Sequence, residues 1–345
     1  MINLKKIGLT ALAGSLVAFS ANAVELSVSG GSEITYTTEG GSESTTGNPF
    51  GAATSMKFSG SGDVGFGEAT IVRTLRDNQS AASYSSAYTT LDMGDMGILS
   101  FDTTGGALVG SAANDDILPT AYEEVWHSVG SAANATTGIS AKNVLGYRNT
   151  FMGVSLSLGM RTGGADTDAS GDGINTGAGS TGETIDWNLK YDVAGVDGLT
   201  LSAGRSVTDA NSYKIVALPS VDDTSNTGHI LYSTGPVSVG YRIAESQSGV
   251  QGAAGTTAEA YSIAFNVNDN LTVSYAEQDL ETDNTRTAIT TTTAAVDTTE
   301  TTKAINAAYT MGAATIRTTL STADAVGGVS GIDDEHMEVS LVLAF

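Results

Sequence analysis

The chain ends in HMEVSLVLAF (residues 336–345), where polar or small residues alternate with apolar ones. Successive side chains of a β-strand point to opposite faces, so this pattern predicts a strand with one apolar face. The strand finishes on the aromatic Phe345. In an exported chain, such an ending favours a β-barrel of a bacterial outer membrane, and we expect Phe345 to serve as the signal read by the barrel-assembly machinery.

The beginning of the chain indicates export. Two lysines (residues 5–6) precede an apolar run over residues 7–19, and an Ala-Asn-Ala cleavage site ends at Ala23. This arrangement predicts a signal peptide over residues 1–23, too short and wrongly flanked for a membrane span. We expect cleavage after Ala23 and a single barrel domain over residues 24–345.

Composition narrows the class of protein. The formal net charge is −23 and becomes about −25 without the two leader lysines, so nucleic-acid binding is not expected. There is no cysteine, which rules out disulfides and thiolate metal sites. After the leader, no stretch approaches the roughly 20 apolar residues of a membrane helix, so a membrane protein of this sequence must be a closed barrel. A secreted β-sandwich or β-solenoid fits composition alone equally well.

The alternation of apolar and polar residues distinguishes a closed barrel from a β-sandwich or β-solenoid. Five stretches put apolar residues on one face and Ser, Thr, Gly, Asn or Arg on the other: residues 154–161, 184–191, 237–244, 261–265 and 271–275. The apolar face often ends in Tyr or Trp, the residues of a membrane-interface girdle, whereas a sandwich core is Val, Ile, Leu and Phe throughout. An apolar exterior around a polar, water-filled interior is therefore the better interpretation.

The connections alternate between short and long, which gives the strand number. Seven short turns are rich in Gly, Asn, Asp and Pro: residues 62–65, 94–97, 149–153, 192–198, 233–236, 266–270 and 310–313. Eight longer segments separate them, at about 38–54, 77–86, 102–142, 162–182, 207–226, 245–257, 277–300 and 321–334. Fifteen connections join sixteen strands. The fold class is therefore predicted as all-β, a transmembrane antiparallel barrel of 16 strands with an aqueous channel.

The longest connection, at about 102–142, is predicted to fold into the barrel as a constriction loop. A loop of this length in a compact domain is usually functional or disordered. It holds apolar residues that favour burial, namely Ile117, Leu118, Tyr122, Val125 and Trp126. It also holds the carboxylates Asp115, Asp116, Glu123 and Glu124. Packing the apolar side on the inner wall, with the carboxylates toward the channel, satisfies both groups.

At three places the chain resembles the general bacterial porins. Asp116-Ile117-Leu118-Pro119 is similar to the Asp-Met-Leu-Pro tip of their third loop, which folds inward. Gly146 to Gly153 is similar to the Tyr-Arg-Asn-Ser-x-Phe-x-Gly strand and turn that follows that loop. Met56 to Gly60 is similar to their second strand, hydrophobic-Arg-Phe-Gly-Phe. These motifs cover about a tenth of the mature chain, and the resemblance in architecture covers all of it.

The resemblance implies a homotrimer in the outer membrane, in contact with lipid and lipopolysaccharide, with one pore per subunit for passive diffusion. It places Asp116 at a constriction carboxylate and Lys57 and Arg148 at basic positions of the opposing wall. Two positions depart from the family: Thr120 replaces a glutamate and Thr103 an arginine. The constriction is thus expected to be less charged, or charged by other residues.

The alternation along each strand predicts which basic residues line the inner wall, independently of the resemblance. A cation on the lipid face near mid-bilayer costs roughly 2–4 kcal/mol, so cations that alternate with apolar residues are expected to point inward. These are Lys57, Arg148, Arg161, Lys190, Arg242 and Arg317, and we place Arg73 with them although the parity of its strand is ambiguous. Arg205 and Lys303 share parity with apolar neighbours, so we expect them near a rim or displaced by a bulge.

Basic wall residues opposite acidic loop residues have two possible roles. They can create a field across the narrowest point that orients dipolar solutes, or they can hold the loop by ion pairs, and both roles stay open. The acidic external loops favour cations, and the basic wall favours anions. The sequence does not decide which effect dominates.

Metal and catalytic motifs are weak. Asp166, Asp168 and Asp172 have the oxygen-ligand spacing of a calcium loop, but Gly177 stands where a bidentate glutamate is needed. A solvated acidic loop is the alternative. His127, His229 and His336 are too scattered in the sequence to indicate a metal site, and no catalytic constellation is visible. We expect no cofactor and no enzymatic activity.

The sequence therefore predicts a channel for small hydrophilic solutes. Three alternatives remain: a solute-specific outer-membrane channel, a secreted or surface adhesin rich in β-structure, and a barrel enzyme such as a lipase or protease.

Overall fold

The computed structural model describes residues 25–42, 46–77, 83–103, 118–136, 143–161, 183–209, 222–249, 253–284 and 296–345. Almost all of these residues are in strands. The predicted signal peptide at residues 1–23 lies outside the described residues. Among the described residues, no helix has the length and apolar character needed to cross a membrane.

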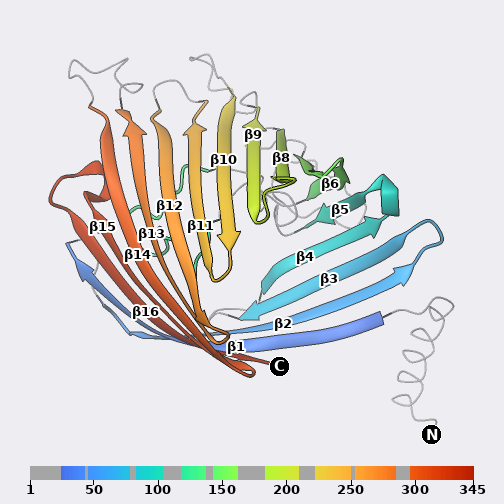
Figure 1. Cartoon of the computed structure of the whole chain (residues 1–345), viewed down its shortest axis with the longest axis horizontal. Helices are drawn as coiled ribbons and strands as arrows, with labels where there is room; N and C mark the ends of the chain where they lie inside the picture. Colours follow the sequence, from blue (N-terminus) through green and yellow to red (C-terminus); the bar gives the residue numbers. More distant parts are fainter. Residues whose placement is uncertain are drawn as a thin grey trace, which may run out of the picture.

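Sixteen antiparallel strands close into one barrel, which confirms the predicted strand number and topology (Figure 1). Each strand pairs with its neighbours in the chain, and β1 pairs with β16 to close the ring. The strands are β1 Glu25–Gly41, β2 Phe50–Asp63, β3 Glu68–Asp77, β4 Ser83–Asp92, β5 Ile98–Asp102, β6 Val144–Phe151, β7 Val154–Arg161, β8 Thr184–Asp192, β9 Leu199–Thr208, β10 Asp223–Thr234, β11 Val237–Gln247, β12 Gly255–Asn268, β13 Leu271–Asp283, β14 Thr298–Met311, β15 Ala314–Asp324 and β16 Asp333–Ala344. Closure leaves no unpaired edge strand.

The carboxyl-terminal strand completes the barrel. The residue pairs run from Gly31 opposite Ala344 to Gly41 opposite Asp334. Beyond the strand, Phe345 and Gly30 exchange two backbone hydrogen bonds of 2.9 Å each. The last residue is therefore part of the closing ladder, and it is largely exposed.

All seven predicted turns connect adjacent strands, but several strands extend further toward the long connections than the sequence analysis expected. β1 continues to Gly41, β13 continues to Asp283, and β16 begins at Asp333. These extensions are rich in Thr, Gly and acidic residues, which lack the apolar face that alternation detects. Cross-strand pairing continues through them regardless, because a ladder needs only backbone groups.

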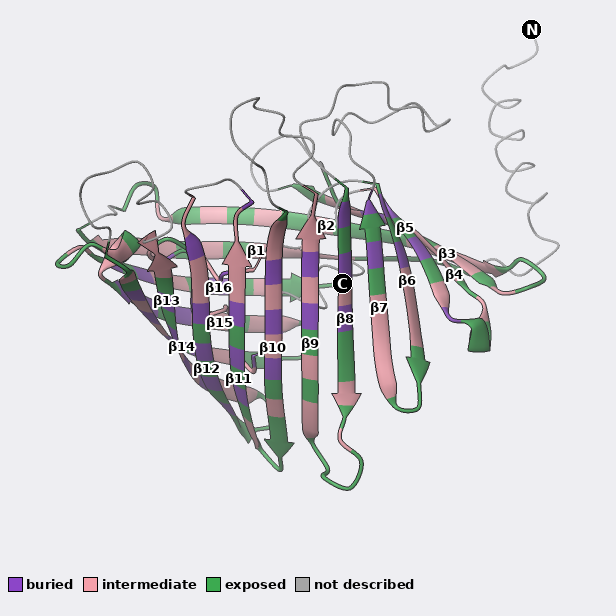
Figure 2. Cartoon of the chain, turned by 90° about the horizontal axis from the view of Figure 1, so that it is seen from above, coloured by how far each residue is buried: buried purple, intermediate pink, exposed green. Residues whose placement is uncertain are grey.

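The two faces of the barrel differ in chemistry. One face carries large apolar side chains that are 37–51% exposed, among them Phe58, Ile71, Tyr241, Ile263 and Leu320. The other face carries Ser, Thr, Asn, Gln and charged residues, and Figure 2 shows the resulting alternation of buried and exposed residues along β8 to β12. Exposed apolar surface of this extent indicates contact with another apolar phase, such as the interior of a membrane.

Contacts of the segment 118–136 identify the polar face as the inner one. Pro119 lies so close to Gly240 of β11 that a Cβ there would stand 2.6 Å from its Cδ, and the Tyr122 hydroxyl bonds to Glu338 of β16. β11 and β16 are five strand spacings apart, about 24 Å along the wall. Three extended residues span about 11 Å, so the segment can reach both strands only from the concave side.

Candidate pore constriction

The segment 118–136, hereafter the inner segment, packs its apolar side on the inner wall. Leu118, Val125 and Trp126 form a buried cluster with Ala260, Ala276 and Ala304. Further along, Ala135 packs with Ala244, Ala258 and Leu280. The alanines on β11 to β14 leave the space that the larger residues of the segment fill. Of the apolar residues named from the sequence, only Ile117 lies outside the described residues.

Polar side chains of the wall hold the backbone of the inner segment. Asn306 donates its amide to Thr120 Oγ1 (3.0 Å) and to the Glu123 carbonyl (2.9 Å), and Gln278 donates to the Ala133 carbonyl (2.9 Å). Asn306 and Gln278 are almost fully buried. Buried backbone carbonyls need partners, so these bonds supply what a helix or sheet would otherwise provide.

Arg242 of β11 anchors the far end of the inner segment. It is completely buried, and its Nη2 donates to the Asn134 carbonyl (2.6 Å) and to Thr136 Oγ1 (3.3 Å). Its guanidinium also lies 5.0 Å from the ring centre of Trp126, a cation–π contact. Arg242 therefore holds the loop in place, which is one of the two roles that the sequence left open for the basic wall residues.

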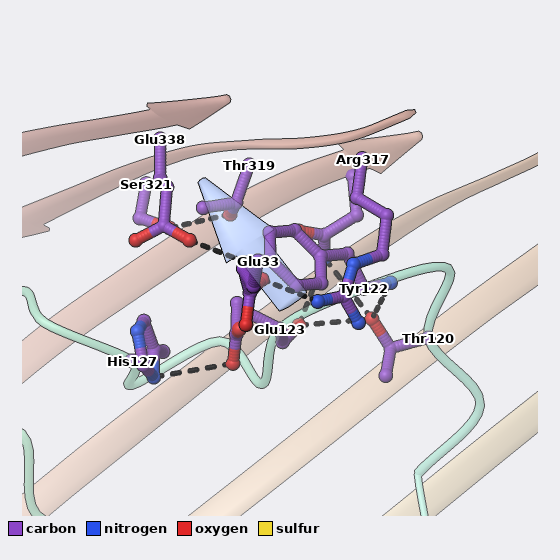
Figure 3. A network of polar contacts seen from close by, with 10 residues as sticks. Glu33, Thr120, Tyr122, Glu123, His127, Arg317, Thr319, Ser321 and Glu338 are labelled. Atoms are coloured by element: carbon purple, nitrogen blue, oxygen red, sulfur yellow. Dashed lines mark hydrogen bonds and ion pairs between the residues drawn. The ribbon is translucent and has the colours of Figure 1, made fainter. Parts of the chain in front are cut away.

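A second anchor joins the near end of the inner segment to β1, β15 and β16 (Figure 3). Arg317 forms an ion pair of 2.5 Å with Glu33 and stacks 4.2 Å over the Tyr122 ring. The Tyr122 hydroxyl bonds to Glu338 and lies 3.4 Å from Glu33 Oε1. Burial, together with the hydrogen bond to Glu338, raises the pKa of Tyr122 far above its ordinary value. The hydroxyl thus remains a donor between two carboxylates at physiological pH.

Two further wall carboxylates receive backbone N–H groups of the inner segment. Glu300 Oε1 accepts from the Ser131 N–H (3.0 Å), and Asp334 Oδ2 accepts from the Gly130 N–H (3.0 Å). Gly130 has a φ of +61°, and a Cβ on it would collide with Glu300. Only glycine allows this close approach.

Five of the predicted basic residues belong to neither anchor, and the register of their strands places four of them on the inner wall. Lys57 and Lys190 lie on the inner face and are exposed, and Arg148 and Arg161 lie there half-buried and buried. Arg73 is an error of the sequence analysis: it pairs with Phe58 and so shares the outer, apolar face. Its guanidinium donates to the carbonyls of Val72 (2.7 Å) and Tyr88 (3.2 Å).

The inner wall also holds one cation and several carboxylates that the sequence analysis did not name. Arg76 pairs with Ser55, two residues from Lys57, and so shares the inner face with it. Glu33, Glu39, Glu300, Asp334 and Glu338 lie on the inner face of β1, β14 and β16. The alternation that indicates the inward lysines and arginines is also the signal that indicates these inward carboxylates, since Glu33 and Glu338 each lie beside apolar residues in the sequence.

The predicted loop carboxylates are only partly described. Glu123 lies beside His127, with 3.2 Å between its Oε2 and the His127 Nδ1, and Glu124 borders a hollow beside Leu118 and Tyr122. Asp115 and Asp116 lie outside the described residues, as do the calcium candidates Asp166, Asp168 and Asp172. His127 and His336, which the sequence analysis treated as unrelated, have ring centres 6.0 Å apart.

Arg205 and Lys303 lie on the outer face, in the halves of their strands nearer the long connections. Arg205 pairs with Trp187 and donates to Asn226 Oδ1 (2.7 Å), and Lys303 pairs with Glu277. No bulge displaces either residue. Their polar neighbours on the same face offset the cost of exposing a charge there.

The interior carries charges of both signs. Carboxylates lie on the inner face of β1, β14 and β16, where the inner segment is anchored, and cations lie on that of β2, β3 and β6 to β8. The buried carboxylates Asp102 of β5 and Asp186 of β8 lie among these cations. Beside the inner segment, a hollow of about 440 Å³ extends to Leu231, Ser233 and Ser238 of β10 and β11. Opposed charges facing a polar space create a field across it and select among ions and dipolar solutes.

Comparisons with solved structures agree on the fold. The chain matches OmpF of Salmonella typhi, solved as a complex with daunomycin, at 14% identity and a TM-score of 0.66, over 94% of this chain and 98% of that one. It matches the outer-membrane channel DcaP of Acinetobacter baumannii at 13% and 0.61, over 94% and 98%. It matches the trimer form of OmpT, an outer-membrane protein of Vibrio cholerae, at 11% and 0.61, over 94% and 100%. No protein-family model and no curated protein sequence matches the chain. The chain has the fold of the outer-membrane porins.

Proposed function

We propose that this chain is a porin of a bacterial outer membrane and forms a water-filled channel for passive diffusion of small hydrophilic solutes and ions. One observation carries the proposal: inside a closed barrel with an apolar exterior, the inner segment covers only the β11 to β1 side of a polar wall. Lys190, on β8 away from that side, and Lys57, on β2 at its border, are both exposed. A segment anchored along one side of the wall narrows the channel. The barrel itself is closed by the pairing of its strands and does not need this segment.

The neighbours in structure support the location and class. Proteins of this fold include an outer-membrane channel and an outer-membrane protein in a trimer form. Arg73 supports a homotrimer, because a cation on the outer face of β3 is costly against lipid but not against a polar surface of another subunit. The remaining proposed partners are lipid, lipopolysaccharide and the barrel-assembly machinery, and the proposed activity is transport without enzymatic turnover.

Liposome swelling tests the diffusion of solutes. Vesicles that contain the folded protein are expected to swell in isotonic sugar solutions, at rates that fall smoothly as the sugar grows larger. Smooth dependence on size is the property of a diffusion channel, whereas a solute-specific channel favours one sugar of a given size over its isomers. Absence of swelling with folded protein in the vesicles would contradict the proposal and favour an adhesin.

A further inference from the structure

Two histidines far apart in the sequence meet at the inner surface with a carboxylate. Ligand atoms of His127, on the inner segment, and of His336 and Glu338, on β16, all lie within 4.8 Å of one another. The two imidazole rings are inclined at 68°. We propose that these three residues bind one divalent transition-metal ion, of the Zn²⁺ class.

Each histidine already has the orienting partner that metal-binding histidines use. Glu39 Oε1 lies 2.8 Å from the Nδ1 of His336, and Glu123 Oε2 lies 3.2 Å from the Nδ1 of His127. A carboxylate on one ring nitrogen fixes the tautomer and makes the other nitrogen a better ligand. Both rings are therefore prepared to coordinate a metal through Nε2.

The burial of His336 points to a missing ligand. The residue is 4% exposed, and its Nε2 has no hydrogen-bond partner among the described residues. A buried polar atom without a partner costs roughly 1–3 kcal/mol, and coordination of a metal would remove that cost. The neighbouring His127 side chain is 36% exposed, so an ion in the interior can reach the site.

The donor set selects the class of metal. Imidazole nitrogens suit Zn²⁺, Cu²⁺ and Ni²⁺, whereas Mg²⁺ and Ca²⁺ prefer oxygen ligands alone. Two imidazoles and one carboxylate leave a fourth position for water, as in open zinc sites. Tetrahedral Zn²⁺ ligands lie about 3.4 Å apart, and the ligand atoms of the three residues lie within 4.8 Å of one another, so each pair needs to approach by at most about 1.4 Å.

Calorimetric titration of the full mature protein in detergent, made without a polyhistidine tag, tests the site with Zn²⁺ as the probe. One Zn²⁺ per chain is expected, and an excess of Mg²⁺ should not displace it. His127→Ala should weaken binding at least about tenfold, and Glu39→Gln, which removes only the orienting charge, about tenfold. His229→Ala is the matched control, since this buried histidine of β10 lies apart from the site.

Binding of Zn²⁺ does not rest on the proposed function, but its effect on ion flow does. An ion held beside Glu338 is expected to reduce the current of the wild type and not that of the His127→Ala variant. No Zn²⁺ bound by the folded wild type, or equal affinities in His127→Ala and His229→Ala, would overturn the site. Zn²⁺ bound by a protein that carries no current would overturn the channel and leave the site standing.

Discussion

Replacing Arg242 by alanine is expected to raise the single-channel conductance, because it releases the far end of the inner segment. The change removes the hydrogen bonds to Asn134 and Thr136 and the contact with Trp126. A hydrogen bond from a charged donor and a desolvated cation–π contact together contribute about 3 kcal/mol. Currents through planar bilayers, with limited proteolysis of the same sample, would show a wider, noisier channel and faster cleavage within residues 118–136.

Arg205→Ala is the matched control for this experiment. It also removes a hydrogen-bonded arginine from a strand, but on the outer face and away from the inner segment. Its conductance should equal that of the wild type. If Arg242→Ala also conducts and resists protease like the wild type, Arg242 does not anchor the segment, and the constriction depends on other contacts.

Reversal of the charge at Lys57 is expected to produce the largest change in ion selectivity. Lys57 is exposed on the inner face of β2, which it shares with Arg76 of β3. A glutamate there replaces attraction of anions by attraction of cations at short range, where salt screens least. The reversal potential under a salt gradient should shift in the direction of cation preference.

Lys303→Glu provides the comparison, because it makes the same change of net charge on the outer face. Its reversal potential should remain that of the wild type. Equal shifts in the two variants would mean that overall charge sets selectivity and that the inner wall has no particular role. No shift in either would mean that ions do not pass Lys57.

Most of the fold could be predicted from the sequence, because alternation is a local property. Stretches such as residues 237–244 alternate without interruption, and turns such as Gly235-Pro236 separate them. Strand ends were less predictable. Beyond Gln278 toward Asp283, β13 alternates poorly and is still paired with both neighbours, a consequence of backbone pairing that side chains do not reveal.

The residues of the site were predictable only where the pattern of a single strand shows which face of the barrel a side chain occupies. Parity placed Lys57 and Lys190 correctly, but it could not place Arg73, since Ile71 and Val72 are adjacent apolar residues and only the pairing with Phe58 decides the face. The anchors and the histidine pair depend on contacts between the inner segment and distant strands. Nothing in the spacing of His127 and His336 indicates that barrel closure and an inward segment bring them together.

Single-channel recording of the purified wild-type protein in planar bilayers tests the central claim most directly. A water-filled barrel narrowed by an anchored segment predicts stable, ohmic openings, in groups of three if the homotrimer forms, with a reversal potential whose sign gives the net selectivity. Absence of current from protein that is demonstrably folded and inserted would contradict the claim. The inner segment would then close the barrel, and the interior would not be a path for solutes.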